Sequence, residues 1–263
     1  MAEHSEIEWT DSTWNPVTGC TKISRGCENC YAYTFAERFR GVRGHPYEQG
    51  FDVKLWPQRL GLPLEWEEPR RIFVNSMSDL FHEKVPTEFI HRVFDTMNAA
   101  RQHTFQILTK RAKRLLDLGP ELEWGPNIWQ GVSCETEAYT WRIDALRKVP
   151  ANIRFLSLEP LLGPLTKLDL RSIHWVIAGG ESGRRARPME SQWAAQIRDQ
   201  CRRANVPFFF KQYGTIRSNP NPRDPTAKEN GGPSKGGRTL AGRVWGQLPQ
   251  LVIVRGPGAA APA

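Results

Sequence analysis

The sequence predicts an α/β protein whose parallel strands form a partial or complete (β/α) barrel. From about residue 70 onward, short apolar runs alternate with segments whose apolar residues recur every three or four positions. The first pattern is typical of buried strands and the second of amphipathic helices. Strands that alternate with helices form right-handed βαβ units, and these units build a parallel sheet. A doubly wound open sheet is the alternative, because periodicity alone does not separate it from a barrel.

Seven short segments are predicted to be strands. The first is Trp14–Thr18, which leads into a loop with three cysteines. The other six are residues 71–76, 104–109, 127–133, 153–159, 174–180 and 207–211. All of these runs are short, and most of their residues are β-branched, aromatic or aliphatic, as in buried strands.

Apolar stripes predict the helices between these strands. Residues 87–100 carry five apolar side chains on one face, and residues 190–204 repeat Trp193, Ile197 and Cys201 at every fourth position. Residues 31–40 also have a helical pattern. Residues 41–69 are rich in Gly, Pro, Trp and charge, and we expect a long insertion there.

The composition changes after residue 213 and predicts a chain of two parts. Residues 1–213 are expected to form the barrel-like domain, and residues 214–263 a basic, Gly/Pro-rich C-terminal extension. Within the extension, residues 248–254 are expected to dock as an edge strand and residues 256–263 to be disordered.

The charge distribution points to an anionic partner without proving one. The formal net charge is +8, and residues 214–263 contribute +5 of it, seven Lys/Arg against Asp224 and Glu229. A basic tail of this kind contacts nucleic-acid phosphates in some proteins and is a solvated linker in others. Both interpretations stay open at this point.

Composition excludes membrane and disulfide-framework classes. The chain is 39% hydrophobic, and no apolar run approaches the roughly 18 residues of a membrane helix. The N-terminus lacks the basic-then-apolar pattern of a signal peptide. Five cysteines, an odd number in a large chain, argue against a disulfide framework. We therefore expect a cytoplasmic protein with reduced cysteines and no membrane partner.

Three cysteines with C-x6-C-x2-C spacing are the strongest chemical signal. Cys20, Cys27 and Cys30 lie within eleven residues and can converge on one soft metal centre. Because there are three thiolates, one coordination position stays open, which is typical of a reactive site.

Two metal centres fit this spacing. C-x2-C is a zinc half-site, but the chain has no second such pair to complete it, and His45 and His82 are isolated candidates for a fourth ligand. The other centre is a [4Fe–4S] cluster bound through three irons, whose fourth iron is free to chelate a small molecule. Gly19 and Gly26 give the loop the backbone freedom that it needs to wrap around a cluster.

Polar residues and two glycines lie at the ends of nearly every predicted strand, where parallel βα proteins place their reacting groups. These residues are Asn75, Ser78, Asp79, Lys110, Arg111, Ser133, Glu159, Gly179, Gly180, Glu181, Arg187 and Lys211. We expect them to share one polar pocket. The run Gly179–Gly183 allows either close ligand approach, with Glu181 holding an ammonium group, or a tight βα turn. Cys134 and Cys201 are predicted to be core residues.

These motifs together resemble a known family. The chain resembles the phage-type three-Cys-motif proteins of phages and bacteria, and more distantly the radical S-adenosylmethionine (SAM) superfamily. The stretches that carry the resemblance are residues 9–16, 19–32, 76–81, 108–111, 158–161, 179–183 and 210–212, and residues 237–245 resemble the C-terminal signature of the family. Ala241 replaces an acidic residue of that signature. The first cysteine gap is longer than the usual C-x3-C-x2-C, and the glycine run follows strand six rather than strand two.

The resemblance implies a radical SAM-like (β/α) barrel and an iron–sulfur enzyme that cleaves SAM reductively to start radical chemistry. Cys20, Cys27 and Cys30 would hold a [4Fe–4S] cluster, and its open iron would bind the amino and carboxylate groups of SAM. The expected cofactor shell is Asn75, Ser78, Asp79, Ser133, Glu159, Gly179, Gly180 and Glu181. Lys110, Arg111, Arg187 and Lys211 are expected to bind an anionic substrate.

The expected partners are a nucleic acid and a reductant protein. The nucleic acid would be DNA or RNA, and the ten tryptophans are compatible with such a partner because aromatic rings stack on bases. The reductant would be of the ferredoxin or flavodoxin kind. The alternative function is a zinc-stapled nucleic-acid-binding protein without radical chemistry.

Overall fold

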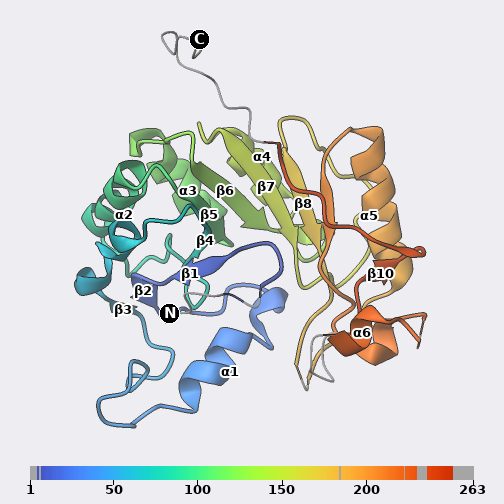
Figure 1. Cartoon of the computed structure of the whole chain (residues 1–263), viewed down its shortest axis with the longest axis horizontal. Helices are drawn as coiled ribbons and strands as arrows, with labels where there is room; N and C mark the ends of the chain where they lie inside the picture. Colours follow the sequence, from blue (N-terminus) through green and yellow to red (C-terminus); the bar gives the residue numbers. More distant parts are fainter. Residues whose placement is uncertain (1–4, 6, 184, 222, 230–235, 251–263) are drawn as a thin grey trace.

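The computed structural model describes residues 5, 7–183, 185–221, 223–229 and 236–250. Seven parallel strands form one sheet in the order β1-β4-β5-β6-β7-β8-β9. Their bounds are β1 Ser12–Trp14, β4 Arg71–Val74, β5 Thr104–Thr109, β6 Ile128–Ser133, β7 Ile153–Leu158, β8 Trp175–Ala178 and β9 Phe208–Phe210. Each strand lies beside the next one along the chain, so the sheet has no switch point and is not doubly wound. It curves into a half-barrel with β1 and β9 as its edges (Figure 1).

The first strand differs from the prediction. It was expected at Trp14–Thr18, but β1 ends at Trp14, and Val17–Thr18 is a separate strand, β2. β2 pairs antiparallel with β3, Lys54–Leu55, outside the main sheet. Pro16 explains the break, because a proline has no N–H to donate to a sheet ladder.

Most of the helices cover the outer face of the half-barrel (Figure 1). Their bounds are α1 Tyr31–Glu37, α2 Thr87–Ala99, α3 Ala112–Leu118, α4 Trp141–Arg147, α5 Ser191–Arg203 and α6 Thr226–Glu229. Short 3-10 turns are η1 Arg25–Cys27, η2 Pro57–Arg59, η3 Leu62–Glu65, η4 Gly119–Glu121, η5 Glu137–Tyr139 and η6 Ile216–Ser218. The helices predicted at 87–100 and 190–204 are confirmed to within one residue at each end.

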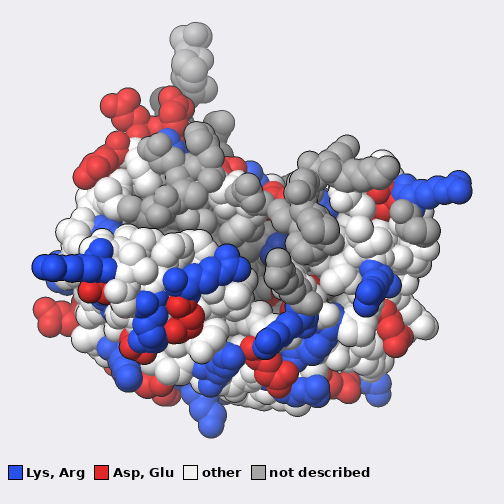
Figure 2. Space-filling view, turned by 90° about the horizontal axis from the view of Figure 1, so that it is seen from below, with Lys and Arg blue, Asp and Glu red and all other residues white. Residues whose placement is uncertain are grey.

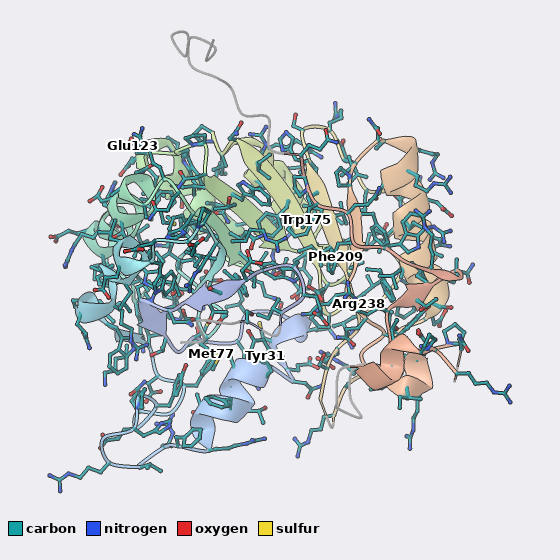
Figure 3. All side chains as sticks on the ribbon, in the orientation of Figure 1. Tyr31, Met77, Glu123, Trp175, Phe209 and Arg238 are labelled. Atoms are coloured by element: carbon teal, nitrogen blue, oxygen red, sulfur yellow. The ribbon has the colours of Figure 1, made fainter. Side chains whose placement is uncertain are left out.

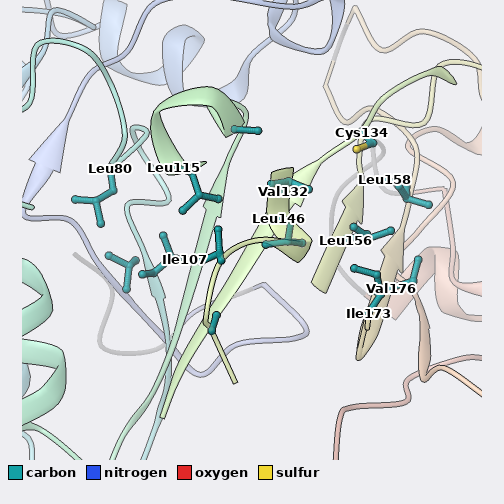
Figure 4. Packing of buried hydrophobic residues seen from close by; sticks show 14 of the residues in the cluster. Leu80, Ile107, Leu115, Val132, Cys134, Leu146, Leu156, Leu158, Ile173 and Val176 are labelled. Atoms are coloured by element: carbon teal, nitrogen blue, oxygen red, sulfur yellow. The ribbon is translucent and has the colours of Figure 1, made fainter. Parts of the chain in front are cut away.

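Alternate residues of each strand face opposite sides of the sheet. On the helix side, Val132, Leu156 and Val176 pack with Leu115 and Leu146 in the main core (Figure 4). Cys134 and Cys201 belong to the same core, and burial raises the pKa of both thiols to about 12. They are core residues, as predicted.

The concave face is filled by aromatic rings at its base. Trp175 lies at the centre, with the ring centroids of Trp9, Trp129, Phe155 and Phe209 between 5.6 and 6.2 Å away. Figure 3 labels Trp175 and Phe209 on their neighbouring strands. Of the ten tryptophans, Trp141 alone is exposed. The other nine are buried or half-buried, and Trp9 is one of the residues that line the cavity described below. Base stacking on tryptophans stays a prediction.

The described part of the C-terminal extension packs on the half-barrel. It contains a hairpin of β10, Thr239–Leu240, and β11, Arg243–Val244. Beyond it, Phe210 N donates to Trp245 O at 2.9 Å, and Gln247 N donates to Phe208 O at 3.2 Å. The chain thus covers the edge of β9, slightly before the predicted edge segment 248–254. Residues 251–254 and 256–263 lie outside the described residues, and the domain boundary at 213 stays a prediction.

In the described part of the chain, no helix is long and apolar enough to cross a bilayer.

Candidate functional site

One cavity joins the three-cysteine loop to the carboxyl ends of the strands. It has a volume of about 430 Å³, a size typical of small-molecule sites. Its lining includes all three cysteines and nine predicted residues: Asn75, Ser78, Asp79, Lys110, Ser133, Glu159, Gly180, Glu181 and Lys211. Gly179, Arg111 and Arg187 do not line it. Figure 2 views the molecule from the side on which α1 lies and shows basic and acidic side chains interspersed on that surface.

Several of these residues meet because the side chains of a strand alternate between its two faces, and theirs point to the concave face of the sheet. Phe73 is followed two residues later by Asn75, Leu108 by Lys110, Phe155 by Ser157 and Phe209 by Lys211. Side chains two residues apart in a strand point to the same face. An aromatic and aliphatic layer therefore forms the base of the cavity, and a polar layer lies above it.

The three cysteine side chains are free thiols, each partly buried, at one side of the cavity. Two glycines allow the loop to pass close to neighbouring protein atoms. Gly19 has a φ of 83°, and a Cβ there would lie 2.1 Å from Asp52 O. A Cβ at Gly26 would lie 2.4 Å from Cγ of Glu135. Larger residues at either position would displace the loop, so the two glycines constrain its path closely.

The chemistry of the three thiols suits a soft metal centre, because such metals prefer thiolate ligands. Burial raises the pKa of the Cys20 thiol to about 12, so metal binding would release its proton. Among the described residues, no group of three His, Cys, Asp or Glu side chains is arranged around a single metal ion. His82 Nε2 is 3.0 Å from Thr21 Oγ1, and its Nδ1 accepts from Lys84 N, so both nitrogens are engaged.

Two side chains lie beside the cysteine sulfurs. Arg111 Nη2 is 3.8 Å from Cys20 Sγ, and Ser24 Oγ is 3.6 Å from Cys27 Sγ. Arg111 also donates to Thr21 Oγ1 at 2.8 Å and pairs with Glu83. Its guanidinium therefore holds the cysteine loop rather than projecting into the cavity. Donors beside thiolates stabilise their negative charge.

A buried ion pair supports the same loop from below. Glu135 and Arg142 are 0% and 2% exposed, and Arg142 Nη1 donates to Glu135 Oε2 at 2.9 Å. The other carboxylate oxygen of Glu135 accepts from Ser24 Oγ. Arg142 is a supporting residue that sequence patterns did not reveal, because it lies on α4 and reaches the loop only in the folded chain.

Arg187 clamps two loops together. It donates to Glu181 from its backbone N and Nε at 2.9 and 2.8 Å, to Glu28 at 2.7 Å and to Arg25 O at 2.9 Å. Burial raises the pKa of Glu181, but hydrogen bonds from Arg187 and Asn29 outweigh that effect and lower it overall. Both charges are therefore satisfied within the protein.

The glycine run makes room for protein atoms. A Cβ at Gly180 would lie 2.1 Å from Tyr213 O, and one at Gly179 would lie 2.8 Å from Glu159 Oε1. Protein atoms therefore lie beside both glycines, and Gly180 also lines the cavity. The loop after β8 continues to residue 190, so it is not a tight βα turn, and ligand contact at this run stays a prediction.

Glu159 and Asp79 already have partners. Lys211 Nζ is 3.3 Å from Glu159 Oε1, and Ser157 Oγ donates to Glu159 Oε2 at 3.3 Å. Asp79 accepts from Thr109 Oγ1, Lys110 N and Phe81 N between 2.7 and 3.1 Å. Asp79 thus joins the loops after β4 and β5.

Lys110 and Asn75 each have a side-chain nitrogen without a hydrogen-bond partner among the described residues. Among the described residues, the Lys110 ammonium group has no hydrogen bond or ion pair, and Asn75 Nδ2 is buried without a partner. Asn75 has a φ of 61°, which asparagine tolerates better than most residues.

Several lining residues were not predicted, among them Ser157, Tyr31, Trp9 and Ser182. Ser157 carried a usable signal, since it lies between Phe155 and Glu159 on the concave face. Tyr31 follows the last cysteine directly.

Comparison with known proteins assigns a family. A family model described as "Protein of unknown function (DUF5131)" matches residues 4–249. The chain belongs to the DUF5131 family. The match extends past residue 213 and includes the segment that covers β9. No curated protein matches the chain significantly.

Two solved structures are similar to this DUF5131 chain, both of spore photoproduct lyase. One is a double mutant with bound AdoMet and dinucleoside spore photoproduct, at 14% identity and a TM-score of 0.42 over 64% of this chain. The other is a complex with dinucleoside spore photoproduct, at 14% identity and a TM-score of 0.40 over 62% of this chain. The chain spans about half the length of these proteins, 55% and 54%.

Proposed function

We propose that this protein is an iron–sulfur enzyme of the radical SAM type. The observation that carries the proposal is that three free, partly buried cysteines share one ligand-sized cavity with the polar strand ends of a parallel half-barrel. Cys20, Cys27 and Cys30 would hold a [4Fe–4S] cluster. When bound there, this group supplies the electron that cleaves SAM reductively and starts radical chemistry.

The residues of the chain would position and shield this chemistry. Arg111 and Ser24 place polar groups beside two of the sulfurs. The ring layer around Trp175 closes the base of the cavity against water. Asn75, Ser133 and Lys110 present polar atoms from neighbouring strands to a ligand in the cavity.

The partners follow from charge and chemistry. The net charge of +8 supports a nucleic-acid-derived substrate, and the cluster would need an electron donor of the ferredoxin or flavodoxin kind. That the relatives occur in phages as well as bacteria stays a prediction from the motifs.

Anaerobic purification followed by metal analysis tests the proposal. We expect a brown protein with about four irons per chain that cleaves SAM when reduced. Cys27→Ala should lose both the iron and the cleavage, whereas the control Cys201→Ala changes a core cysteine and should keep both. A colourless protein with one zinc would contradict the proposal and support the zinc-stapled nucleic-acid-binding alternative.

A further inference from the structure

Three of the described residues that line the cavity are lysines, and two of them already have partners. Lys22 Nζ donates to Glu28 O at 2.9 Å and lies 4.6 Å from the centre of the Tyr33 ring. Lys211 is paired with Glu159. Lys110 has no partner among the described residues, although its backbone N–H bonds to Asp79. One lysine of the lining is therefore free to bind a ligand.

None of the described carboxylates of the lining forms an ion pair with the Lys110 ammonium group, although Asp79 accepts from the Lys110 backbone N–H. Asp79, Glu159 and Glu181 are bonded to Thr109, Lys211 and Arg187 respectively, and Glu8 also has a partner. An unpaired ammonium group in a partly enclosed site favours an anion, because the low local polarity strengthens the attraction.

Neutral donors lie next to Lys110. β5 and β6 are in register with Thr109 opposite Val132, so Lys110 and Ser133 follow side by side at the strand ends. The Ser133 hydroxyl has no hydrogen bond within the described residues. On the other side, β4 leads into Asn75, which is 2% exposed and whose Nδ2 lacks a partner within the described chain. All three residues line the cavity.

We propose that Lys110, Ser133 and Asn75 form an oxyanion subsite. It takes a carboxylate or phosphate group, with Lys110 neutralising the charge and the hydroxyl and amide donating hydrogen bonds. Two of the residues expected to bind substrate are thereby removed from the set, because Arg111 is bonded to Thr21 and Arg187 to Glu181. The subsite adds detail to the proposed function. It rests on that function only for the choice of SAM or a nucleotide as the ligand.

Two pairs of probes distinguish the source of the anion. S-adenosylhomocysteine and its decarboxylated analogue differ by a carboxylate, and AMP and adenosine differ by a phosphate. Calorimetric titration of the full-length, anaerobically purified protein gives the affinity ratio within each pair. We expect the anionic member of at least one pair to bind roughly ten- to a hundredfold more tightly, as for one charge-assisted hydrogen bond.

Variants connect that preference to Lys110. Lys110→Gln should remove the preference, and Lys110→Arg should keep most of it. Lys113→Gln removes the same charge from an exposed position on α3 outside the cavity and should change nothing. Thermal unfolding of each variant controls for loss of the fold.

The outcomes are separable. A preference within the carboxylate pair assigns the subsite to the SAM tail, and one within the phosphate pair assigns it to a nucleotide substrate. Absence of any preference in the wild type, or an unchanged preference in Lys110→Gln, overturns the subsite. Neither result depends on SAM cleavage, so failure of the subsite is distinguishable from failure of the proposed enzyme.

Discussion

At the scale of single residues, contacts define which positions tolerate change. Gly180 illustrates this, because its neighbouring atom is a backbone carbonyl that cannot rotate away. Such a position is set by the path of a distant segment, here residues 211–214, and not by local turn chemistry alone.

We expect Gly180→Ala to destabilise the protein by about 1–3 kcal/mol, the usual cost of overpacking. Its Cβ would lie 2.1 Å from Tyr213 O. The control is Gly163→Ala, whose Cβ would meet no atom within 4 Å. Urea unfolding of both variants gives the difference, and equal free energies of unfolding would show that the loop moves freely.

Substitution of Arg142 is predicted to lower the free energy of unfolding more than substitution of an exposed arginine. Arg142→Met leaves the buried Glu135 carboxylate without its cation, which typically costs about 3–5 kcal/mol. Arg171→Met, at an ion pair whose arginine is 84% exposed, should destabilise the protein far less, because water and salt screen an exposed pair. Chemical denaturation compares them. A small loss in Arg142→Met would mean that Glu135 becomes protonated or solvated.

At the scale of elements, two histidines secure the starts of strands. His103 precedes β5 and accepts from Arg70 N at 3.2 Å, and His174 precedes β8 and accepts from Arg154 N at 3.0 Å. Burial lowers the pKa of both. Each imidazole therefore stays neutral in the fold and joins two neighbouring strands.

Stability should fall in mild acid. In the unfolded chain these histidines gain protons near their ordinary pKa of about 6.5. In the folded chain burial lowers their pKa, so they gain protons only at lower pH. The unfolded state thus binds more protons below that pH, and the free energy of unfolding should decrease as pH falls from about 7.5 to 5. Urea titrations across this range check the trend. The double variant His103→Gln/His174→Gln should show a weaker pH dependence of the free energy of unfolding. An equally steep dependence in that variant would mean that other groups cause it.

At the scale of the whole molecule, excess positive charge predicts salt-sensitive binding to nucleic acids. The net charge is +8, and basic and acidic side chains intermix on the face in Figure 2. We expect the affinity for a single-stranded oligonucleotide to decrease steeply between about 50 and 200 mM salt, as counterion release requires. Fluorescence anisotropy measures this. Binding that does not vary with salt, or no binding at low salt, would argue against a nucleic-acid partner.

Much of the fold was predictable from periodicity. Six of the seven strands and both long helices lie where apolar spacing places them. The first strand was misplaced because the apolar pattern crosses Pro16, where the ladder stops. The sequence also did not show which of the ten tryptophans are buried, because composition does not reveal which rings packing will cover.

By itself, the sequence determined the order of strands and helices, the three-cysteine loop and the alternation that places Asn75, Lys110 and Ser133 on one rim. Only the tertiary structure decided which charges remain available. Arg187 is occupied by Glu181 and Glu28, Arg111 by Thr21 and Glu83, and Lys211 by Glu159. Lys110 keeps its charge free within the described chain. The reason is that ion pairs depend on distances between segments far apart in sequence, which local patterns do not encode.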